Sequence, residues 1–240
     1  METPIMTLRK FARDILSCLP VLLGFLTIHS ALAAAYIVPS ASMEPTLMIG
    51  DQIGVVVPSY GLSTANLPFG HVLKPHDSSG GRLFGHLPRR GDVVVFRAPA
   101  NLHQTWIKRV IGLPGDRIAL VHGHVVLNGI ELAWKEMGPA REESRRGVWL
   151  PAERYDETLP GNVHHNILKL SQDGELDNIA PFTVPAGHLF VMGDNRDNSA
   201  DSRVSVADGG VGLLPVWNLQ GQARAVLWSW RDITRTALIL

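Results

Sequence analysis

The chain has 240 residues, a formal net charge of zero and 18% charged residues. This length fits one domain, and the balanced charge offers no basic surface of the kind that nucleic-acid-binding domains carry. The single cysteine, Cys18, excludes an intrachain disulfide and a multi-cysteine metal site.

Residues 15–37 contain no Asp, Glu, Lys or Arg and predict a single transmembrane anchor. As a helix this segment would be about 34 Å long, which is enough to cross a hydrocarbon core about 30 Å thick. Arg9, Lys10 and Arg13 precede the segment. Because positive flanks stay in the cytoplasm, we expect residues 1–14 to form a cytoplasmic tail and the rest of the chain to lie outside.

Two other interpretations of this segment stay open. Residues 31–33 and 33–35 both fit the Ala-x-Ala pattern at which cleavable signal peptides are cut. The second alternative is a buried core helix. The anchor and the cleaved signal both place the main domain outside the cytoplasmic membrane.

After the anchor, short apolar runs are separated by turn residues, which predicts a mainly β fold with an antiparallel sheet or barrel-like arrangement. A hairpin is expected at 117–127, with Asn128-Gly129 as the next turn. The strands are expected at residues 52–57, 92–97, 106–111, 117–121, 124–127, 163–170, 188–192 and 223–230.

The strand pattern divides the chain into a main β domain and two elaborations. Residues 38–135 and 181–240 form the predicted main domain. Residues 136–180 are polar and weakly patterned, and are expected to form an inserted small β subdomain or loop region. Residues 58–90 are rich in Gly, Pro, His and Ser and are expected to be largely loop.

Four segments carry the candidate chemistry. Residues 39–47 (PSASMEPTL) place two serines in a shaped turn, and residues 90–96 (RGDVVVF) begin a strand. Residues 106–116 (WIKRVIGLPGD) place Lys108 within an apolar strand, where burying its charge is costly. An exposed edge strand is the alternative setting for such a lysine.

The fourth segment, residues 193–203 (GDNRDNSADSR), follows a strand and is rich in hydrogen-bonding groups. It is either solvated surface or a rigid support for a site. A calcium loop fits poorly, because its sixth position would be Ser202 instead of glycine and its twelfth Asp208 instead of glutamate.

A serine and a lysine can act together, because a serine hydroxyl needs a base before it attacks a carbonyl. A free lysine has a pKa near 10.4, so fewer than about one in a thousand are neutral at pH 7. Burial lowers that pKa. A value of about 8 would leave roughly a tenth of the molecules neutral, at a cost of about 3 kcal/mol.

The 10 histidines offer another base. Composition therefore leaves a Ser/His/Asp triad open, and a two-histidine metal site at His122 and His124 is a weaker possibility. No histidine lies in a segment comparable to the four described above.

The four segments, in this order behind an amino-terminal anchor, resemble those of bacterial type I signal peptidases, which are serine proteases with a Ser/Lys dyad. The resemblance covers most of the chain from Pro39 to about Trp230. It is weakest in residues 58–90 and 136–180. One departure is that Arg203 is followed by a Gly-rich loop, where family members often carry an aromatic pair.

The resemblance implies a role for each of eight residues. Ser42 corresponds to the nucleophile, Lys108 to the general base, and Ser199 to a serine that hydrogen-bonds and orients the lysine. Ser40 corresponds to the hydroxyl that forms the oxyanion hole with the backbone N–H of Ser42. Four residues correspond to the framework of the site, with a pair expected between the first two: Arg109, Asp194, Asp201 and Arg203.

The resemblance further implies a membrane-bound endopeptidase that removes N-terminal signal peptides from exported preproteins. It would cut where small residues occupy the −1 and −3 positions, and use no cofactor and no metal. Its partners would be Ala-x-Ala signal peptides and the lipid bilayer. It would span the bacterial inner membrane once, with the catalytic domain on the periplasmic face.

Two rival functions stay open. One is a relative with a narrow client range, such as a protease for pilus or conjugation proteins, or a Ser/Lys protein that cleaves only itself. The other is a membrane-tethered β binding module without catalysis.

Overall fold

The structure is a computed structural model. The structure describes residues 33–61, 84–143, 147–172 and 174–239, together with the single positions 20, 63, 66 and 82. Within these residues, antiparallel strands dominate, and two short 3-10 helices occur, η1 (Ala41–Met43) and η4 (Val216–Asn218). This confirms the mainly β, antiparallel fold class.

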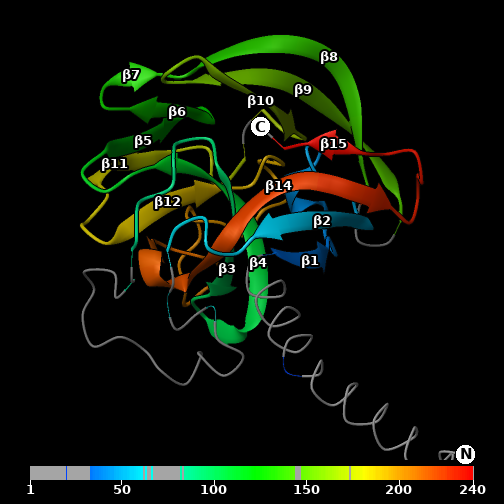
Figure 1. The fold of residues 1–240 in the computed structure, drawn as a ribbon. Coiled ribbons are helices and arrows are strands. Elements are labelled where there is room, and N and C mark those ends of the chain that lie inside the picture. Colours follow the sequence, from blue (N-terminus) through cyan, green and yellow to red (C-terminus); the bar gives the residue numbers. More distant parts are fainter. Residues whose placement is uncertain are drawn as a thin grey trace, which may run out of the picture.

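The largest sheet has eight strands (Figure 1). Seven of them follow the order β1–β2–β14–β3–β4–β12–β13, and β15 pairs with β14. The bounds of these strands are β1 (Ala33–Ile37), β2 (Asp51–Val56), β3 (Val93–Ala98), β4 (Asn101–Gly112), β12 (His188–Met192), β13 (Leu214–Pro215), β14 (Leu219–Ser229) and β15 (Ala237–Leu238).

Strand β14, from the C-terminal part of the chain, lies between β2 and β3. The approach is close at Gly221, where an added Cβ would lie 2.6 Å from the carbonyl oxygen of Val56. Glycine is therefore required at this position, because a side chain would push the two strands apart. The half of the sheet that begins with β1 and the half that contains β4 are joined through β14.

Both faces of the sheet are covered at β3. Val94 and Phe96 pack in one buried cluster, whereas Val93 and Val95 pack in another. A strand that is buried on both faces needs an apolar residue at every position, which explains the continuous run in residues 93–96.

A second sheet has four strands in the order β11–β5–β6–β7. The predicted turn after β6 is present, with left-handed backbone at Asn128 (φ 53°) and Gly129 (φ 86°). Two positive φ values are what a tight two-residue hairpin turn requires. The bounds are β5 (Arg117–Val121), β6 (His124–Leu127), β7 (Ile130–Glu131) and β11 (Ile179–Thr183).

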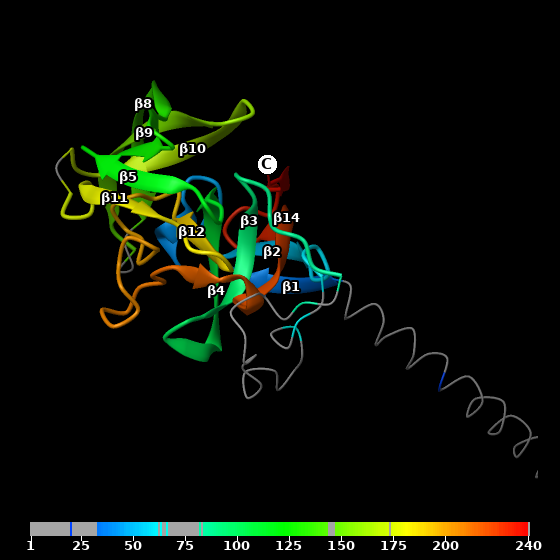
Figure 2. The same ribbon diagram turned by 90° about the vertical axis from the view of Figure 1, so that its left-hand side faces the viewer.

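The third sheet has three strands in the order β10–β9–β8, and forms a separate layer beside the other sheets (Figures 1 and 2). Its strands are β8 (Ala133–Glu143), β9 (Trp149–Leu159) and β10 (Val163–Lys169). It lies in the region where the sequence predicted an inserted β subdomain or loop. Only β10 was predicted as a strand.

The predicted anchor, residues 15–37, lies mostly outside the described residues. Its last five residues form β1 instead, and pair along their whole length with β2. In β1 the backbone N–H and C=O groups of these residues find their partners in β2, so a helix is not needed to satisfy them. Among the described residues, no helix has the length and apolar character needed to cross a membrane.

Candidate active site

The predicted nucleophile, Ser42, lies in η1, between β1 and β2. Its apolar neighbours place it: Met43 is fully buried in a cluster with Leu47 and Ile53. Met43 and Leu47 therefore anchor the turn that carries Ser42 in the core. Only 9% of Ser42 is exposed.

The predicted base, Lys108, lies in β4 opposite Val94 of β3. It is 4% exposed, so the structure places it in the interior and not on an exposed edge. Its Nζ lies 2.7 Å from Oγ of Ser42 and 2.9 Å from the carbonyl oxygen of Ile107. The serine and the lysine are therefore in direct hydrogen-bonding contact.

Burial lowers the pKa of Lys108 from 10.5 to about 8, because the ammonium form loses its hydration in the protein interior. The carboxylates of Asp201 and Asp194 act in the opposite direction, and Arg203 assists the lowering. Desolvation dominates, so a sizeable fraction of Lys108 is neutral near pH 7 to 8.

Ser40 lies beside the nucleophile, with its Oγ 3.4 Å from Oγ of Ser42. The hydroxyl of Ser40 therefore flanks Oγ of Ser42.

Ser199 is buried, but it does not form the predicted hydrogen bond with Lys108. Its Oγ has no hydrogen-bond partner among the described residues. Its closeness to the nucleophile is seen at Gly193, where an added Cβ would lie 2.3 Å from Oγ of Ser199 and 2.4 Å from the carbonyl oxygen of Ser42. Gly193 thus keeps the two segments in contact.

Arg109 and Asp194 form a buried, two-pronged ion pair, with Nε–Oδ1 and Nη2–Oδ2 distances of 2.8 Å. The guanidinium also donates to the carbonyl oxygen of Gly91 at 2.7 Å, and Thr46 donates to Asp194 at 2.5 Å. Although burial opposes ionisation, the charge of Arg109 and these hydrogen bonds lower the pKa of Asp194.

Asp201 and Arg203 form a second ion pair, with Nε–Oδ1 and Nη2–Oδ2 distances of 2.9 Å. Asp201 also accepts the backbone N–H of Gly193 at 3.0 Å. Burial again opposes ionisation, but Arg203 and the backbone donors lower the pKa of Asp201. Both pairs brace residues 193–203 beside the dyad.

Sequence reasoning missed two residues that hold the nucleophile turn. Asn195 donates from Nδ2 to the carbonyl oxygen of Ala41 at 3.2 Å, and its N–H reaches the carbonyl oxygen of Ser42 at 3.3 Å. Glu44 is fully buried two residues after Ser42. Its position inside the PSASMEPTL segment could have identified it from the sequence.

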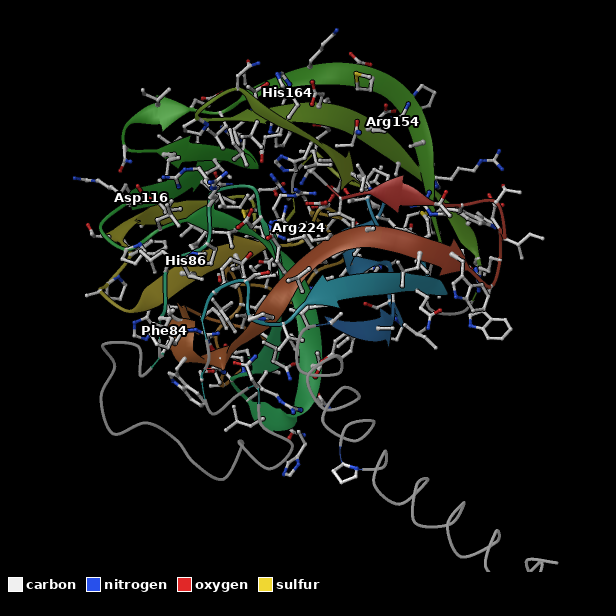
Figure 3. The ribbon with its side chains drawn as sticks, viewed as in Figure 1. Phe84, His86, Asp116, Arg154, His164 and Arg224 are labelled. Carbon is white, nitrogen blue, oxygen red and sulfur yellow. The ribbon has the colours of Figure 1, made fainter. Side chains whose placement is uncertain are left out.

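Among the residues that the structure describes, the histidines do not form a catalytic site with Ser42. Within the described chain, the hydroxyl of Ser42 hydrogen-bonds only to Lys108 and Ser40. His86 and His164 lie far apart in Figure 3, and His164 pairs with Asp156. No group of three His, Cys, Asp or Glu side chains suited to a metal ion occurs in the described residues.

The calcium-loop alternative for residues 193–203 is also contradicted. Asp197 accepts a hydrogen bond from Lys169 at 2.6 Å and from the backbone N–H of Leu170 at 2.7 Å. Asp201 is paired with Arg203. The carboxylates that would bind calcium are therefore engaged by cations and backbone donors of the protein itself.

Comparisons with known proteins identify the family of the chain. A family model described as "Signal peptidase, peptidase S26" matches residues 11–228. The chain is 37% identical over 226 residues to Signal peptidase I of Pseudomonas aeruginosa, covering 90% of this chain and 72% of that protein. It is 38% identical over 221 residues to Signal peptidase I of Pseudomonas fluorescens, with 90% and 72% coverage.

A further relative and a solved structure also match the chain. Signal peptidase I of Rickettsia bellii is 32% identical over 214 residues, covering 85% of this chain and 68% of that protein. A crystal structure of a signal peptidase I from Enterococcus faecalis V583 is 26% identical and covers 57% of this chain and 97% of that one, with a TM-score of 0.33. From the family model and the curated relatives, the chain belongs to the signal peptidase family, peptidase S26.

Proposed function

We propose that this chain is a serine endopeptidase that removes N-terminal signal peptides from exported preproteins, with Ser42 as nucleophile and Lys108 as general base. The observation that carries the proposal is the 2.7 Å contact between Nζ of Lys108 and Oγ of Ser42, at a lysine whose pKa is lowered to about 8. A neutral amine at this distance is placed to take the hydroxyl proton.

In the first half of the reaction, Oγ of Ser42 attacks the scissile carbonyl carbon while its proton passes to the lone pair of Lys108. The oxyanion accepts hydrogen bonds from the backbone N–H of Ser42 and from Oγ of Ser40. When the C–N bond breaks, the ammonium of Lys108 returns the proton to the leaving amine, and an acyl-enzyme remains.

In the second half, neutral Lys108 takes a proton from water, and the resulting hydroxide attacks the ester carbonyl. The proton then returns to Oγ of Ser42, which frees the new carboxyl terminus. Each oxyanion donor supplies about 2.7–4 kcal/mol of transition-state stabilisation. Protons and electrons balance without a cofactor or metal.

Ser199 is assigned to orienting the lysine. A neutral amine has two N–H groups, and one of them donates to the carbonyl oxygen of Ile107. The second is free for Oγ of Ser199, which is buried and has no partner among the described residues.

The substrate is an extended segment with small side chains at −1 and −3, because the family acts on Ala-x-Ala sites. We also propose that residues preceding β1 anchor the enzyme in the bacterial inner membrane. The cations Arg9, Lys10 and Arg13 would then stay in the cytoplasm, and the catalytic domain would face the periplasm. Ser42 would lie next to the bilayer in which the signal peptide is held.

Cleavage of a preprotein with Ala at −3 and −1 tests this function. The full chain in detergent is compared with Ser42→Ala and Lys108→Ala, both checked for native folding by circular dichroism. Cleavage at the Ala-x-Ala bond by the unchanged protein alone is the expected result. A folded, unchanged protein that leaves this preprotein intact would contradict the proposal and favour a narrow-client protease or a non-catalytic module.

A further inference from the structure

Glu44 joins the nucleophile turn to the β8–β9 hairpin. Its backbone N–H closes η1 by donating to the carbonyl oxygen of Ala41 at 3.0 Å. Its side chain has 0% exposure, and Oε2 accepts the backbone N–H of Glu143, at the end of β8, at 3.2 Å. A shift of this carboxyl group therefore moves the turn that carries Ser42.

Two buried carboxyl oxygens at this junction lack partners. Among the described residues, Oε1 of Glu44 and Oε2 of Glu142 accept no hydrogen bond. Glu142 is 1% exposed, and its other oxygen accepts a hydrogen bond from Nδ2 of Asn198. Two buried carboxylates with unsatisfied oxygens are costly, whereas one proton between them satisfies both, since a protonated carboxyl group donates an O–H.

The surrounding charges favour that proton. Glu142 and Glu143 face Glu44 from β8, and Arg231 faces it from the segment after β14. Arg231 is paired with Glu143, and Arg235 of the same segment is paired with Asp51. Burial is the largest effect and raises the pKa of Glu44 to about 7; the hydrogen bond from the Glu143 N–H opposes it, the charges of Glu142 and Glu143 reinforce it, and Arg231 opposes it least.

We propose that Glu44 is a positioning residue for Ser42: it shares a proton with Glu142, and this carboxyl pair fixes the nucleophile turn against the segment that carries Ser199. The link runs from η1 through Glu44 and Glu142 to Asn198, the neighbour of Ser199. The catalytic part of the inference rests on the proposed Ser/Lys mechanism. Loss of the proton leaves two buried negative charges that repel each other, and the turn moves away from Lys108.

The shared proton is tested without catalysis, by thermal unfolding of the full chain in detergent at several values between pH 4.5 and 8. The folded pKa of Glu44 lies above its ordinary value of 4.5, so the folded state holds a proton that the unfolded state releases. The stability contributed is lost as the pH rises from about 4.5 to about 7. Glu44→Gln donates an amide N–H to Glu142 at every pH, so its Tm should gain several degrees on the unchanged protein across this window.

Glu136→Gln is the matched control, because Glu136 is an exposed carboxyl group on the same strand, β8. It should follow the unchanged protein at every pH. If Glu44→Gln follows it as well, the shared proton is ruled out.

The positioning role is tested by cleavage kinetics on the Ala-x-Ala preprotein. Glu44→Ala should lower kcat about tenfold with KM unchanged, because the turn loses its alignment, while Glu44→Gln stays within about twofold. The ratio of kcat at pH 9 to kcat at pH 7 should be higher in Glu44→Gln than in the unchanged protein.

Full kcat in Glu44→Ala would overturn the positioning role. No cleavage by the unchanged protein would overturn the dyad mechanism, and the unfolding experiment would still decide whether the proton is shared.

Discussion

Burial lowers the pKa of Lys108 to about 8 although two carboxylates lie near it. Asp194 and Asp201 would favour the ammonium form, but each is paired with its own arginine, Arg109 and Arg203. The desolvation of the lysine therefore outweighs their attraction. The two ion pairs brace the site and also limit the negative potential that reaches the amine.

The activity should rise with pH through the pKa of the lysine, about 8. In Glu44→Gln, where residue 44 does not titrate, kcat should fall about tenfold per pH unit below that value, because only the neutral amine accepts the serine proton, and should level off above it. Single-turnover cleavage from pH 5 to 10 measures this profile. A rate that is constant from pH 5 to 8 would exclude Lys108 as the base.

The same burial has a cost in stability that Lys108→Met removes. The folded pKa lies below the ordinary 10.5, so the folded state binds fewer protons between about 8 and 10.5, and stability rises with pH across that window. At pH 7 the substitution should raise the free energy of unfolding by about 3 kcal/mol, at 1.36 kcal/mol per pKa unit, while abolishing cleavage.

Denaturant unfolding at pH 7 measures this gain, with Lys135→Met as control, since Lys135 is exposed on β8. The control should change the free energy of unfolding by less than about 0.5 kcal/mol. An equal effect of the two substitutions would show that the burial of Lys108 carries no penalty.

Among the elements, strands with many buried apolar residues were predicted more accurately than strands that are largely exposed. β5, β6 and β12 have alternating or continuous apolar residues and were predicted with their observed bounds. β8 and β9 were missed because most of their residues are at least partly exposed, so neither strand shows an apolar face. β1 was assigned to the anchor because its sequence, AAAYI, is apolar in either setting.

The three-stranded sheet is joined to the catalytic segment by a buried ion pair between Glu157 of β9 and Arg196, with Nη1–Oε1 at 2.9 Å. His165 and Trp134 also contact this carboxylate. Arg196→Met should cost about 3–5 kcal/mol in unfolding, because it leaves the buried charge of Glu157 uncompensated.

The double variant Glu157→Gln with Arg196→Met should recover part of that loss, since no unpaired charge remains. Urea unfolding of both single variants and the double variant measures the interaction. Strictly additive losses would show that the two groups do not interact across this junction.

At the scale of the whole molecule, the residues of the site and the Arg109–Asp194 pair were predictable, but most of the other contacts were not. Ser42 and Lys108 are 66 positions apart, and Thr46 and Asp194 are 148 apart. No local pattern reports such pairings, so the dyad followed from the resemblance of ordered segments. The absent hydrogen bond of Ser199 and the role of Glu44 depend on side-chain geometry, which periodicity does not encode.

The pairing of β1 with β2 also limits how far the chain can be shortened from its N-terminus without a loss of stability. A chain that begins at Ala33 keeps β1 and its pairing with β2, with Tyr36 packed on the core. A chain that begins at Val38 loses that strand and exposes the edge of β2, so its urea midpoint should be lower. Equal midpoints for the two truncations would show that β1 adds nothing to the stability of the sheet.

The position of β14 orders events during synthesis. Ser42 precedes β2 in the chain and Lys108 lies in β4, but β2 and β3 are held together through a strand that ends at Ser229. Pairings this distant in sequence form late. A ribosome-bound chain that lacks β14 should therefore carry Ser42 and Lys108 without bringing them together. We expect no protease activity until translation is nearly finished.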